Sequence, residues 1–258
     1  MPATPETVTA FARRLVEPNP GPMTLDGTNT WILQAPGAES VVVVDPGDLG
    51  HEEHLNALAA LPVELILITH SHADHSDLAP ELARRTGAPV RAWQASLSQD
   101  AEPLADGEIL RAAGIALEVL HTPGHTADSL CFHLPEDGPH GSVLTGDTIL
   151  GRGTTVLGPE RGSLGDYLAS LERLLTLGPA TALTGHAAPL PSLEAVAGEY
   201  LAHRRARLDE VRAALDRLGP EAGAADIADV VYGEVDPRIR FAAMSSLRAQ
   251  LEHLRDHG

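Results

Sequence analysis

Three histidines and an aspartate fall within residues 70–75, directly after the apolar run 65–68. Neutral imidazole and carboxylate groups are the usual protein ligands of zinc and of neighbouring transition metals. In an extended chain His70 and His72 point to the same side, so both can reach one ion. A turn at the aspartate and histidine that follow can carry them toward a second ion. The stretch therefore predicts a strand that ends in a metal-binding loop.

A helix is expected directly after this loop. Ser76 or Asp77 can cap a helix over residues 78–86, and Gly87 can end it. The alternative is that these are scattered histidines without a shared role, because the chain contains 13 of them. We prefer the metal-binding interpretation because four ligand-type side chains crowd one strand end.

Further ligand-type residues follow later strand-like runs in the same way. His125 stands in a Pro-Gly-His-Thr turn, Asp147 in Thr-Gly-Asp and His186 in Thr-Gly-His. Asp45 follows four consecutive valines and precedes Pro-Gly. Together with residues 69–75, these motifs resemble those of the metallo-β-lactamase superfamily in their order. Proline takes the place of the family's threonine after the first aspartate.

The resemblance implies a four-layer αββα sandwich that holds two metal ions and a bridging hydroxide. Two Zn²⁺ ions are the expected cofactors. Zinc is favoured because His72 stands where members with a redox di-iron centre tend to have glutamate, and Mn²⁺ or Fe²⁺ are the alternatives. Asp74 and Asp147 are the expected catalytic carboxylates, and Asp147 is expected to bridge the ions. Asp45 is expected to orient a ligand histidine or, alternatively, to be an ordinary turn residue. The resemblance further implies His70, His72 and His125 as ligands of the first ion, and Asp74, His75 and His186 as ligands of the second.

Residues 19–31 predict turns followed by a strand, because proline and glycine precede Thr-Asn-Thr-Trp-Ile-Leu. The segment is similar to one that the lactamase-like endoribonuclease (beta-lactamase-like protein 2) subfamily of mitochondria and its bacterial relatives carry beside the metal site. Trp31 replaces the subfamily's tyrosine. On this interpretation Asn29 and Thr30 support the metal site or touch substrate. The alternative is a plain surface hairpin.

Strand-like and helix-like patterns alternate along most of the chain, which fits a mixed α/β (α+β) class with two sheets covered by helices. After Pro191 the pattern becomes entirely helical and rich in arginine. The expected strands are 41–44, 64–68, 90–93, 117–120, 130–134, 142–144 and 181–183, and the expected helices are 52–60, 78–86, 166–177, 193–218, 226–232 and 238–253.

Two domains are expected from this change in pattern. Residues 1–192 form the catalytic domain, and residues 193–258 form a small helical, winged-helix-like domain in which the strands of a wing are missing. His203 and Arg204 match a His-Arg pair near the start of the subfamily's appendage, so they are candidate substrate residues.

A glycine-rich loop over residues 151–158 follows Asp147 without the glycine and lysine spacing of a phosphate loop. Its Arg152 can meet an anionic substrate at the pocket rim or be a plain surface arginine. His121 is not expected to be a ligand. The remaining histidines are expected at the surface; they are His51, His54, His133, His140, His253 and His257.

The formal net charge is −18, which argues against a broad surface that binds polyanions. The single cysteine, Cys131, lies in a strand-like run and fits a reducing compartment. Neither an export signal nor an apolar run of transmembrane length is found, so we expect a cytoplasmic protein without a membrane partner.

A binuclear zinc-dependent hydrolase is the function that these features favour. Cleavage of phosphodiester bonds in single-stranded RNA ranks slightly ahead because of residues 19–31 and the C-terminal helices. The alternative is an ester or thioester hydrolase that acts on acyl carriers or resembles glyoxalase II. A metal-stabilised binding protein without activity is a third possibility, which the complete ligand set opposes. The sequence leaves the oligomeric state open.

Overall fold

The four valines at 41–44 form a strand that is buried on both faces, as expected for a continuous apolar run. Val42 and Val44 face the space between two sheets, whereas Val41 and Val43 face a layer of helices. This strand therefore lies between the core of the two sheets and a layer of helices. The computed structural model describes residues 4–157, 162–219, 221–233 and 240–257.

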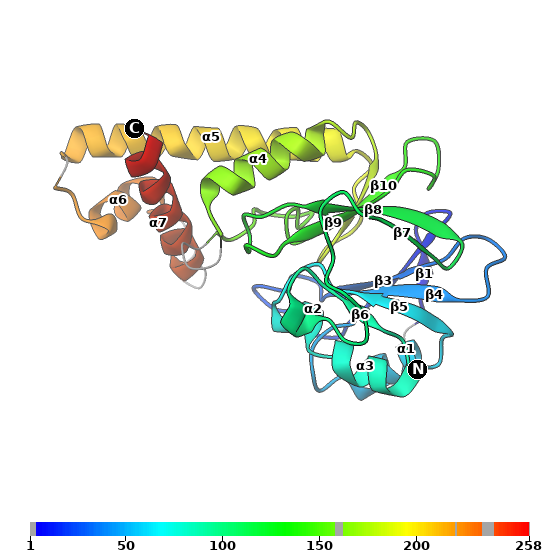
Figure 1. The fold of residues 1–258 in the computed structure, drawn as a ribbon. Helices are drawn as coiled ribbons and strands as arrows, with labels where there is room; N and C mark the ends of the chain where they lie inside the picture. The colour runs from blue at the N-terminus through cyan, green and yellow to red at the C-terminus, as the bar shows by residue number, and fades with distance from the viewer. Residues whose placement is uncertain (1–3, 158–161, 220, 234–239, 258) are drawn as a thin grey trace.

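Two sheets pack face to face, and helices cover both outer faces (Figure 1). The expected four-layer αββα sandwich is confirmed. The first sheet has the order β1 (Glu6–Thr7), β2 (Ala12–Val16), β3 (Asn29–Leu33), β4 (Val41–Val44), β5 (Val63–Leu67) and β6 (Val90–Arg91). The second has the order β11 (Thr181–Thr184), β10 (Ser142–Gly146), β9 (Leu130–Leu134), β8 (Ile115–His121) and β7 (Ile109–Ala112).

The helices divide between the two sheets and a C-terminal group (Figure 1). Apolar residues of α1 and α3 pack on the outer face of the first sheet, and those of α4 and α5 on that of the second. The helices are α1 (Glu52–Ala59), α2 (Ala73–Ser76), α3 (Ala79–Thr86), α4 (Leu164–Leu175), α5 (Leu193–Leu218), α6 (Ala224–Val231) and α7 (Arg240–His257), with a short 3₁₀ turn at Ala95–Leu97.

Helix α5 is shared between two hydrophobic clusters. Its first half, from Leu193 to Leu208, packs with α4 and the second sheet. Its second half, with Val211 and Ala214, packs with α6 and α7. Among the described residues after 192, the structure contains helices and no strand. The proposed domain boundary at 192/193 stays a prediction.

The sequence patterns missed β2, in which Arg13 and Arg14 are both half-buried, and β7, in which exposed and buried residues alternate. Helix α4 begins earlier than expected because Ser163 accepts a hydrogen bond from the Asp166 backbone N–H, which caps the helix there. Helix α6 also begins earlier, at Ala224, and residues 238 and 239 of the last expected helix lie outside the described residues. None of the described helices has both the length and the apolar character needed to span a membrane, and the cytoplasmic location stays a prediction.

Candidate metal centre

The strand directions bring the ligand-type residues to one edge of the sandwich. Strands β4 and β5 are parallel, so Asp45 and the loop from His70 leave the first sheet at the same edge. Strands β10 and β11 are also parallel, which places Asp147 beside His186. Strand β8 runs in the direction of β10, because β9 is antiparallel to both, and His125 therefore joins them.

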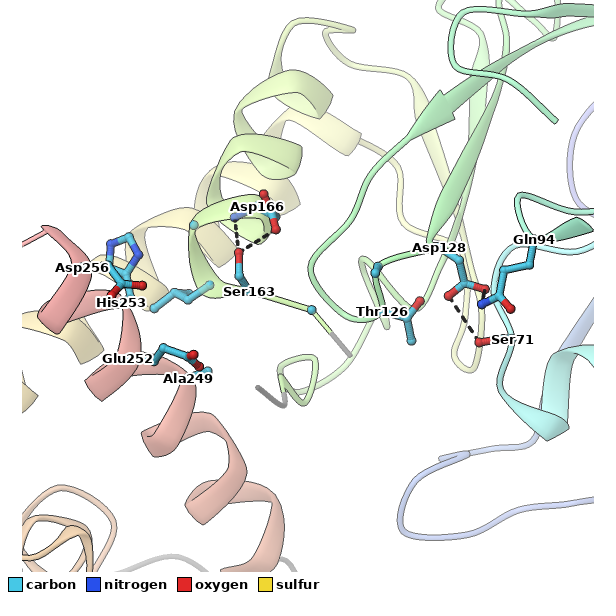
Figure 2. Close-up of a pocket in the computed structure, with 14 residues that line it drawn as sticks. Ser71, Gln94, Thr126, Asp128, Ser163, Asp166, Ala249, Glu252, His253 and Asp256 are labelled. Atoms are coloured by element: carbon cyan, nitrogen blue, oxygen red, sulfur yellow. Dashed lines mark hydrogen bonds between the residues drawn. The ribbon is translucent and has the colours of Figure 1, made fainter. Parts of the chain in front are cut away.

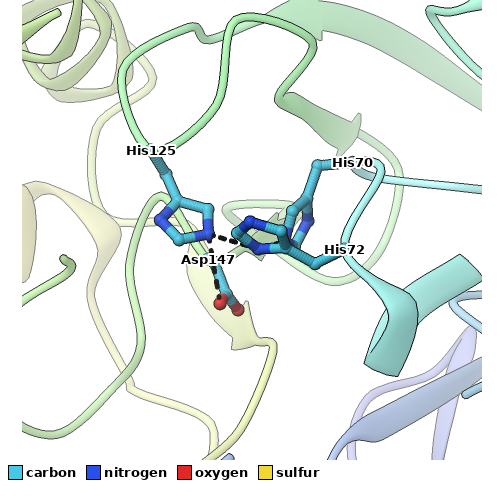
Figure 3. A group of neighbouring side chains, drawn as sticks. All are labelled: His70, His72, His125 and Asp147. Carbon is cyan, nitrogen blue, oxygen red and sulfur yellow. Dashed lines mark hydrogen bonds and ion pairs between the residues drawn. The ribbon is translucent and has the colours of Figure 1, made fainter. Parts of the chain in front are cut away.

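The first group of donors consists of three imidazoles and one carboxylate (Figure 3). His72 Nδ1 lies 3.0 Å from His70 Nε2 and 3.0 Å from His125 Nε2. Asp147 Oδ2 lies 3.6 Å from His125 Nε2. Tetrahedral bonds of about 2.0–2.1 Å to one zinc ion would separate nitrogen ligands by about 3.3 Å, so this spacing fits a single ion.

The second group lies on the other side of the Asp147 carboxylate. His75 Nε2 and His186 Nε2 are 3.2 Å apart, and Asp74 Oδ2 is within 3.5 Å of both. Asp147 Oδ1 is 3.4 Å from His75 Nε2 and 3.2 Å from His186 Nε2. Each oxygen of Asp147 thus faces a different group, which is the arrangement needed by a carboxylate between two ions.

Burial keeps the first three imidazoles neutral. It lowers the pKa of His70 well below its usual range, lowers that of His72 to about 4 and lowers that of His125. A neutral imidazole retains the lone pair that binds a metal ion. Asp147 Oδ1 is buried and, within the described residues, has no hydrogen-bond partner. An orphaned buried carboxylate oxygen is costly unless a cation meets it, so the donor set fits divalent metal ions.

His75 has the opposite pKa shift, and Asp45 is part of the reason. Burial lowers the pKa of His75, but the carboxylates of Asp45 and Asp147 outweigh it and hold the pKa well above its usual range. Asp45 Oδ2 lies 2.8 Å from His75 Nδ1 and accepts a hydrogen bond from the Thr69 hydroxyl, while Oδ1 accepts one from the Thr69 N–H. The Asp45 backbone has φ of 55°, which the turn after β4 requires. Asp45 therefore fixes the ring orientation of His75.

Thr30 and Asn29 lie behind the metal centre instead of in it. The Thr30 hydroxyl donates to the Asp45 carbonyl and lies 2.9 Å from His54 Nε2. Asn29 donates from its amide to the carbonyls of Thr184 and Ala187, which brackets the loop that carries His186. Both residues therefore hold the backbone beside ligand-type residues.

The prediction that His54 lies at the surface is wrong. His54 is 5% exposed, and burial lowers its pKa to about 4. It projects from α1 toward the Thr30 hydroxyl, so it faces the sheet. The charged neighbours at 52 and 53 hide this in the sequence, and only the helical phase relative to Leu55 and Leu58 suggests an inward position.

Glu17 is a buried carboxyl that the sequence patterns did not single out. It is fully buried, and both of its oxygens accept hydrogen bonds from the Asp48 N–H. Burial raises its pKa to about 8. A side-chain Cβ at Gly47 would lie 2.5 Å from its carboxylate, so glycine is required there. Together with Asp48 and His51, Glu17 forms a third group of donor atoms within 4.8 Å of one another.

The three other candidate substrate residues lie outside both groups of donors. Arg152 is exposed and pairs with Asp26. Arg204 is 3% exposed, and its guanidinium donates to the Thr155 carbonyl. His203 is half-buried and lines a cavity with Arg204 and part of the glycine-rich loop. Thr155 connects this region to the centre, because its hydroxyl donates to the Asp147 carbonyl.

Two cavities adjoin the loops that carry the donors. The larger, of about 620 Å³, extends from Ser71 and Thr126 to α7 (Figure 2). Its described lining contains four carboxylates and no arginine; the carboxylates are Asp128, Asp166, Glu252 and Asp256. We call it the acidic cavity. The smaller, of about 340 Å³, lies between Leu150–Val156, the N-terminal turn and the C-terminal helices, and its described lining contains three arginines and no carboxylate. We call it the basic cavity.

Comparisons with known proteins agree with this geometry. Residues 23–96 and 93–186 match the metallo-beta-lactamase superfamily. The chain is 30% identical to the beta-lactamase-like protein 2 homolog of Caenorhabditis elegans, over 96% of this chain and 85% of that protein. It is 30% identical to the atrochrysone carboxyl ACP thioesterase of Claviceps purpurea, over 93% and 78%. A solved metallo-beta-lactamase family protein of Thermus thermophilus superposes with a TM-score of 0.77 at 29% identity, covering 96% of this chain and 94% of that chain.

Proposed function

The chain belongs to the metallo-β-lactamase superfamily and is a hydrolase; from this premise we propose that it cleaves small carboxylic thioesters or esters at a pair of zinc ions. His70, His72 and His125 would hold the first ion, Asp74, His75 and His186 would hold the second, and Asp147 would serve both. Bound ions would supply Lewis acidity and a water activated at neutral pH.

The charge of the acidic cavity is the observation that carries this choice of substrate. The cavity begins at Ser71, between two ligand-type histidines, and Asp128 and Glu252 line it (Figure 2). A polyanion that approached from this side would meet these carboxylates in a molecule of net charge −18. A neutral acyl thioester meets no such barrier. The similarity to the ACP thioesterase of Claviceps purpurea supports the same class of bond.

The chain's own residues position the substrate and the ions. Of the seven donors, five are buried, and only His72 and Asp74 are half-buried. Substrate therefore approaches past these two. Asp45 keeps the His75 ring aligned through the contact between its Oδ2 and His75 Nδ1. In the overall reaction, the oxygen of water bonds to the acyl carbon, the carbon–sulfur bond breaks, and the sulfur leaves as a thiol after taking up a proton.

RNA cleavage remains the second candidate, because residues 19–31 resemble those of the lactamase-like endoribonucleases. In the structure, this segment contributes the strand β3 and the turn before it, and the Asp26 N–H donates to the His186 carbonyl. Its position beside the centre is compatible with either substrate.

The test is a direct comparison of substrates with the zinc-loaded full chain. Acyl thioesters of N-acetylcysteamine and of coenzyme A, labelled single-stranded RNA and a generic phosphodiester reporter are assayed side by side. We expect turnover of thioesters and none of RNA, and the Asp147→Asn variant serves as the inactive control. RNA cleavage without thioester turnover would replace our proposal by the second candidate.

A further inference from the structure

The basic cavity combines apolar walls with a cluster of cationic side chains. Leu25, Leu150 and Val156 line one side, and Tyr232 and Ala243 of the C-terminal region line the other. At about 340 Å³ it is within the range of about 300–1,000 Å³ that small-molecule sites occupy. Such walls suit an aliphatic or aromatic group better than a polar one.

Two segments on the first side of this cavity also contact the metal centre. The Val156 carbonyl lies 3.0 Å from His125 Nδ1, and Thr155 donates to the Asp147 carbonyl. The N-terminal turn that supplies Leu25 continues into Gly27, whose carbonyl lies 3.4 Å from His186 Nδ1. Segments that line the cavity, or directly follow its lining, therefore also contact ligand-type residues.

Arg204 is the strongest sign of what the cavity binds. Its guanidinium is almost fully buried, yet none of the described carboxylates lies within ion-pairing distance. Its contacts are the Thr155 carbonyl and the face of the Tyr167 ring, 5.1 Å from the ring centroid. A buried guanidinium is costly without a counter-ion, and its planar array of donors matches a carboxylate.

Two neighbours on α5 add to this cationic cluster. Arg207 lies over the Tyr232 ring, 5.2 Å from its centroid, and pairs with the exposed Glu210. His203 Nδ1 is buried and has no hydrogen-bond partner within the described residues. Three cationic or hydrogen-bonding groups within about one turn of α5 thus line one partly apolar cavity.

We propose that the basic cavity binds the acyl part of the substrate and that this acyl part carries a carboxylate. This inference rests on the proposed thioester hydrolysis and names its substrate class. The carboxylate is held by Arg204 and Arg207, with His203 as an additional partner, while the aliphatic chain lies along Leu150 and Val156. The thiol part then leaves on the side of the acidic cavity.

A phosphate on the thiol carrier is the other possible source of a negative charge. The apolar walls favour the acyl group, because a pantetheine arm carries two amides that these aliphatic side chains would leave without hydrogen bonds. An assay can separate the two sources, since N-acetylcysteamine thioesters have no phosphate and coenzyme A thioesters do.

The first experiment measures binding, so it does not depend on turnover. Dicarboxylic acids from glutaric to suberic acid and monocarboxylic acids of matching length are titrated into the zinc-loaded full chain by calorimetry. Both kinds can place one carboxylate at the metal centre, and only a dicarboxylate can also reach Arg207. We expect at least one dicarboxylate to bind about 10–100-fold more tightly than its partner, the range for a hydrogen bond to a charged group.

Variants identify the cavity as the source of this preference. Arg207→Gln and His203→Gln should each reduce the preference for the dicarboxylate, with Arg207→Gln giving the larger loss. The matched control is Arg205→Gln, on the same helix, because Arg205 is exposed and pairs with Glu172 away from the cavity. The control should retain the full preference, and far-ultraviolet circular dichroism should be equal in all three variants.

The second experiment compares N-acetylcysteamine thioesters with and without a terminal carboxylate. We expect kcat/KM to favour the carboxylated acyl group through a lower KM. Arg207→Gln should remove this preference, and Arg205→Gln should retain it. The proposal would be overturned if Arg207→Gln and Arg205→Gln showed the same preference for the carboxylated acyl group. It would also be overturned if Arg207→Gln lowered kcat/KM only for coenzyme A thioesters, whether or not the acyl group carries a carboxylate. No turnover of any thioester, together with a retained dicarboxylate preference, would contradict the proposed hydrolysis and leave the binding site established.

Discussion

The acidic and basic cavities adjoin the same donors but differ in charge and in origin. The acidic cavity extends from Ser71 and Thr126 to exposed carboxylates of α7, and the basic cavity from Val156 to arginines of α5. One helical appendage thus supplies opposite charges to two sides of one centre. A substrate can be oriented by this difference, because a negative group is repelled on one side and bound on the other.

The largest effect is expected from Asp147, which faces both groups of donors. Asp147→Asn removes the charge that lies between the two ions, so we expect loss of at least one ion per chain and a fall in kcat of about a thousandfold or more, in line with the several kcal/mol that metal catalysis supplies. Metal content by plasma mass spectrometry and thioesterase kinetics measure both. The control is Asp128→Asn, a buried carboxylate of the acidic cavity that accepts hydrogen bonds from Ser71 and Gln94. Full metal content with normal turnover in Asp147→Asn would contradict a role of Asp147 between the two ions.

Asp45→Asn should have the next largest effect, because it leaves the cavities intact and disturbs only the support of the second ion. Asparagine tolerates the φ of 55° but cannot accept from both Thr69 and His75 as the carboxylate does. We expect metal affinity to fall about 10–100-fold. A titration of the metal-depleted protein with zinc measures this, and the preference for carboxylated acyl groups should persist once zinc is saturating. Unchanged affinity would mean that Asp45 is an ordinary turn residue.

His54 lies away from both cavities, so it should affect stability without changing selectivity. Its pKa in the folded chain is about 4, against 6.5 in the unfolded chain, so the unfolded state binds more protons between these values. The stability contributed by neutral His54 is therefore present above about pH 6.5 and lost as the pH falls toward 4, by up to about 1.4 kcal/mol per pH unit.

This pH dependence is measured by urea unfolding of the wild type and of His54→Gln. The difference in the free energy of unfolding between them should change with pH only in this window, and His140→Gln, at an exposed position, should match the wild type. Parallel curves for wild type and His54→Gln would contradict a buried neutral imidazole.

The smallest effect is expected from reversing charges in the acidic cavity. Glu252→Arg combined with Asp256→Arg should raise kcat/KM for coenzyme A thioesters about three- to tenfold at low salt, through faster association of the anionic carrier. The gain should disappear at high salt and be absent for N-acetylcysteamine thioesters. The same reversal at the exposed Glu39 and Glu136 controls for net charge. Equal gains from both pairs would show that total charge decides, and that the cavity has no separate role.

The sequence by itself determined the fold class and the set of residues that the fold brings together. Local patterns were sufficient because each ligand-type residue lies in the segment that follows a strand whose apolar run is visible in the chain, from Val41–Val44 to Thr181–Thr184. Parallel pairing then places those strand ends at one edge, and the matching motifs made their order recognisable. The assignment of individual residues to ions stays a prediction of the same kind.

Only the tertiary structure decided which polar groups face inward and how charge is divided around the centre. Glu17 and His54 resemble ordinary charged-surface residues in the sequence, and their burial depends on packing against Gly47 and Thr30 from distant segments. Arg204 and Arg205 are adjacent in the sequence, yet one is buried at the basic cavity and the other is exposed. Contacts between segments far apart in the chain set these differences, and a local pattern of residues carries no information about them.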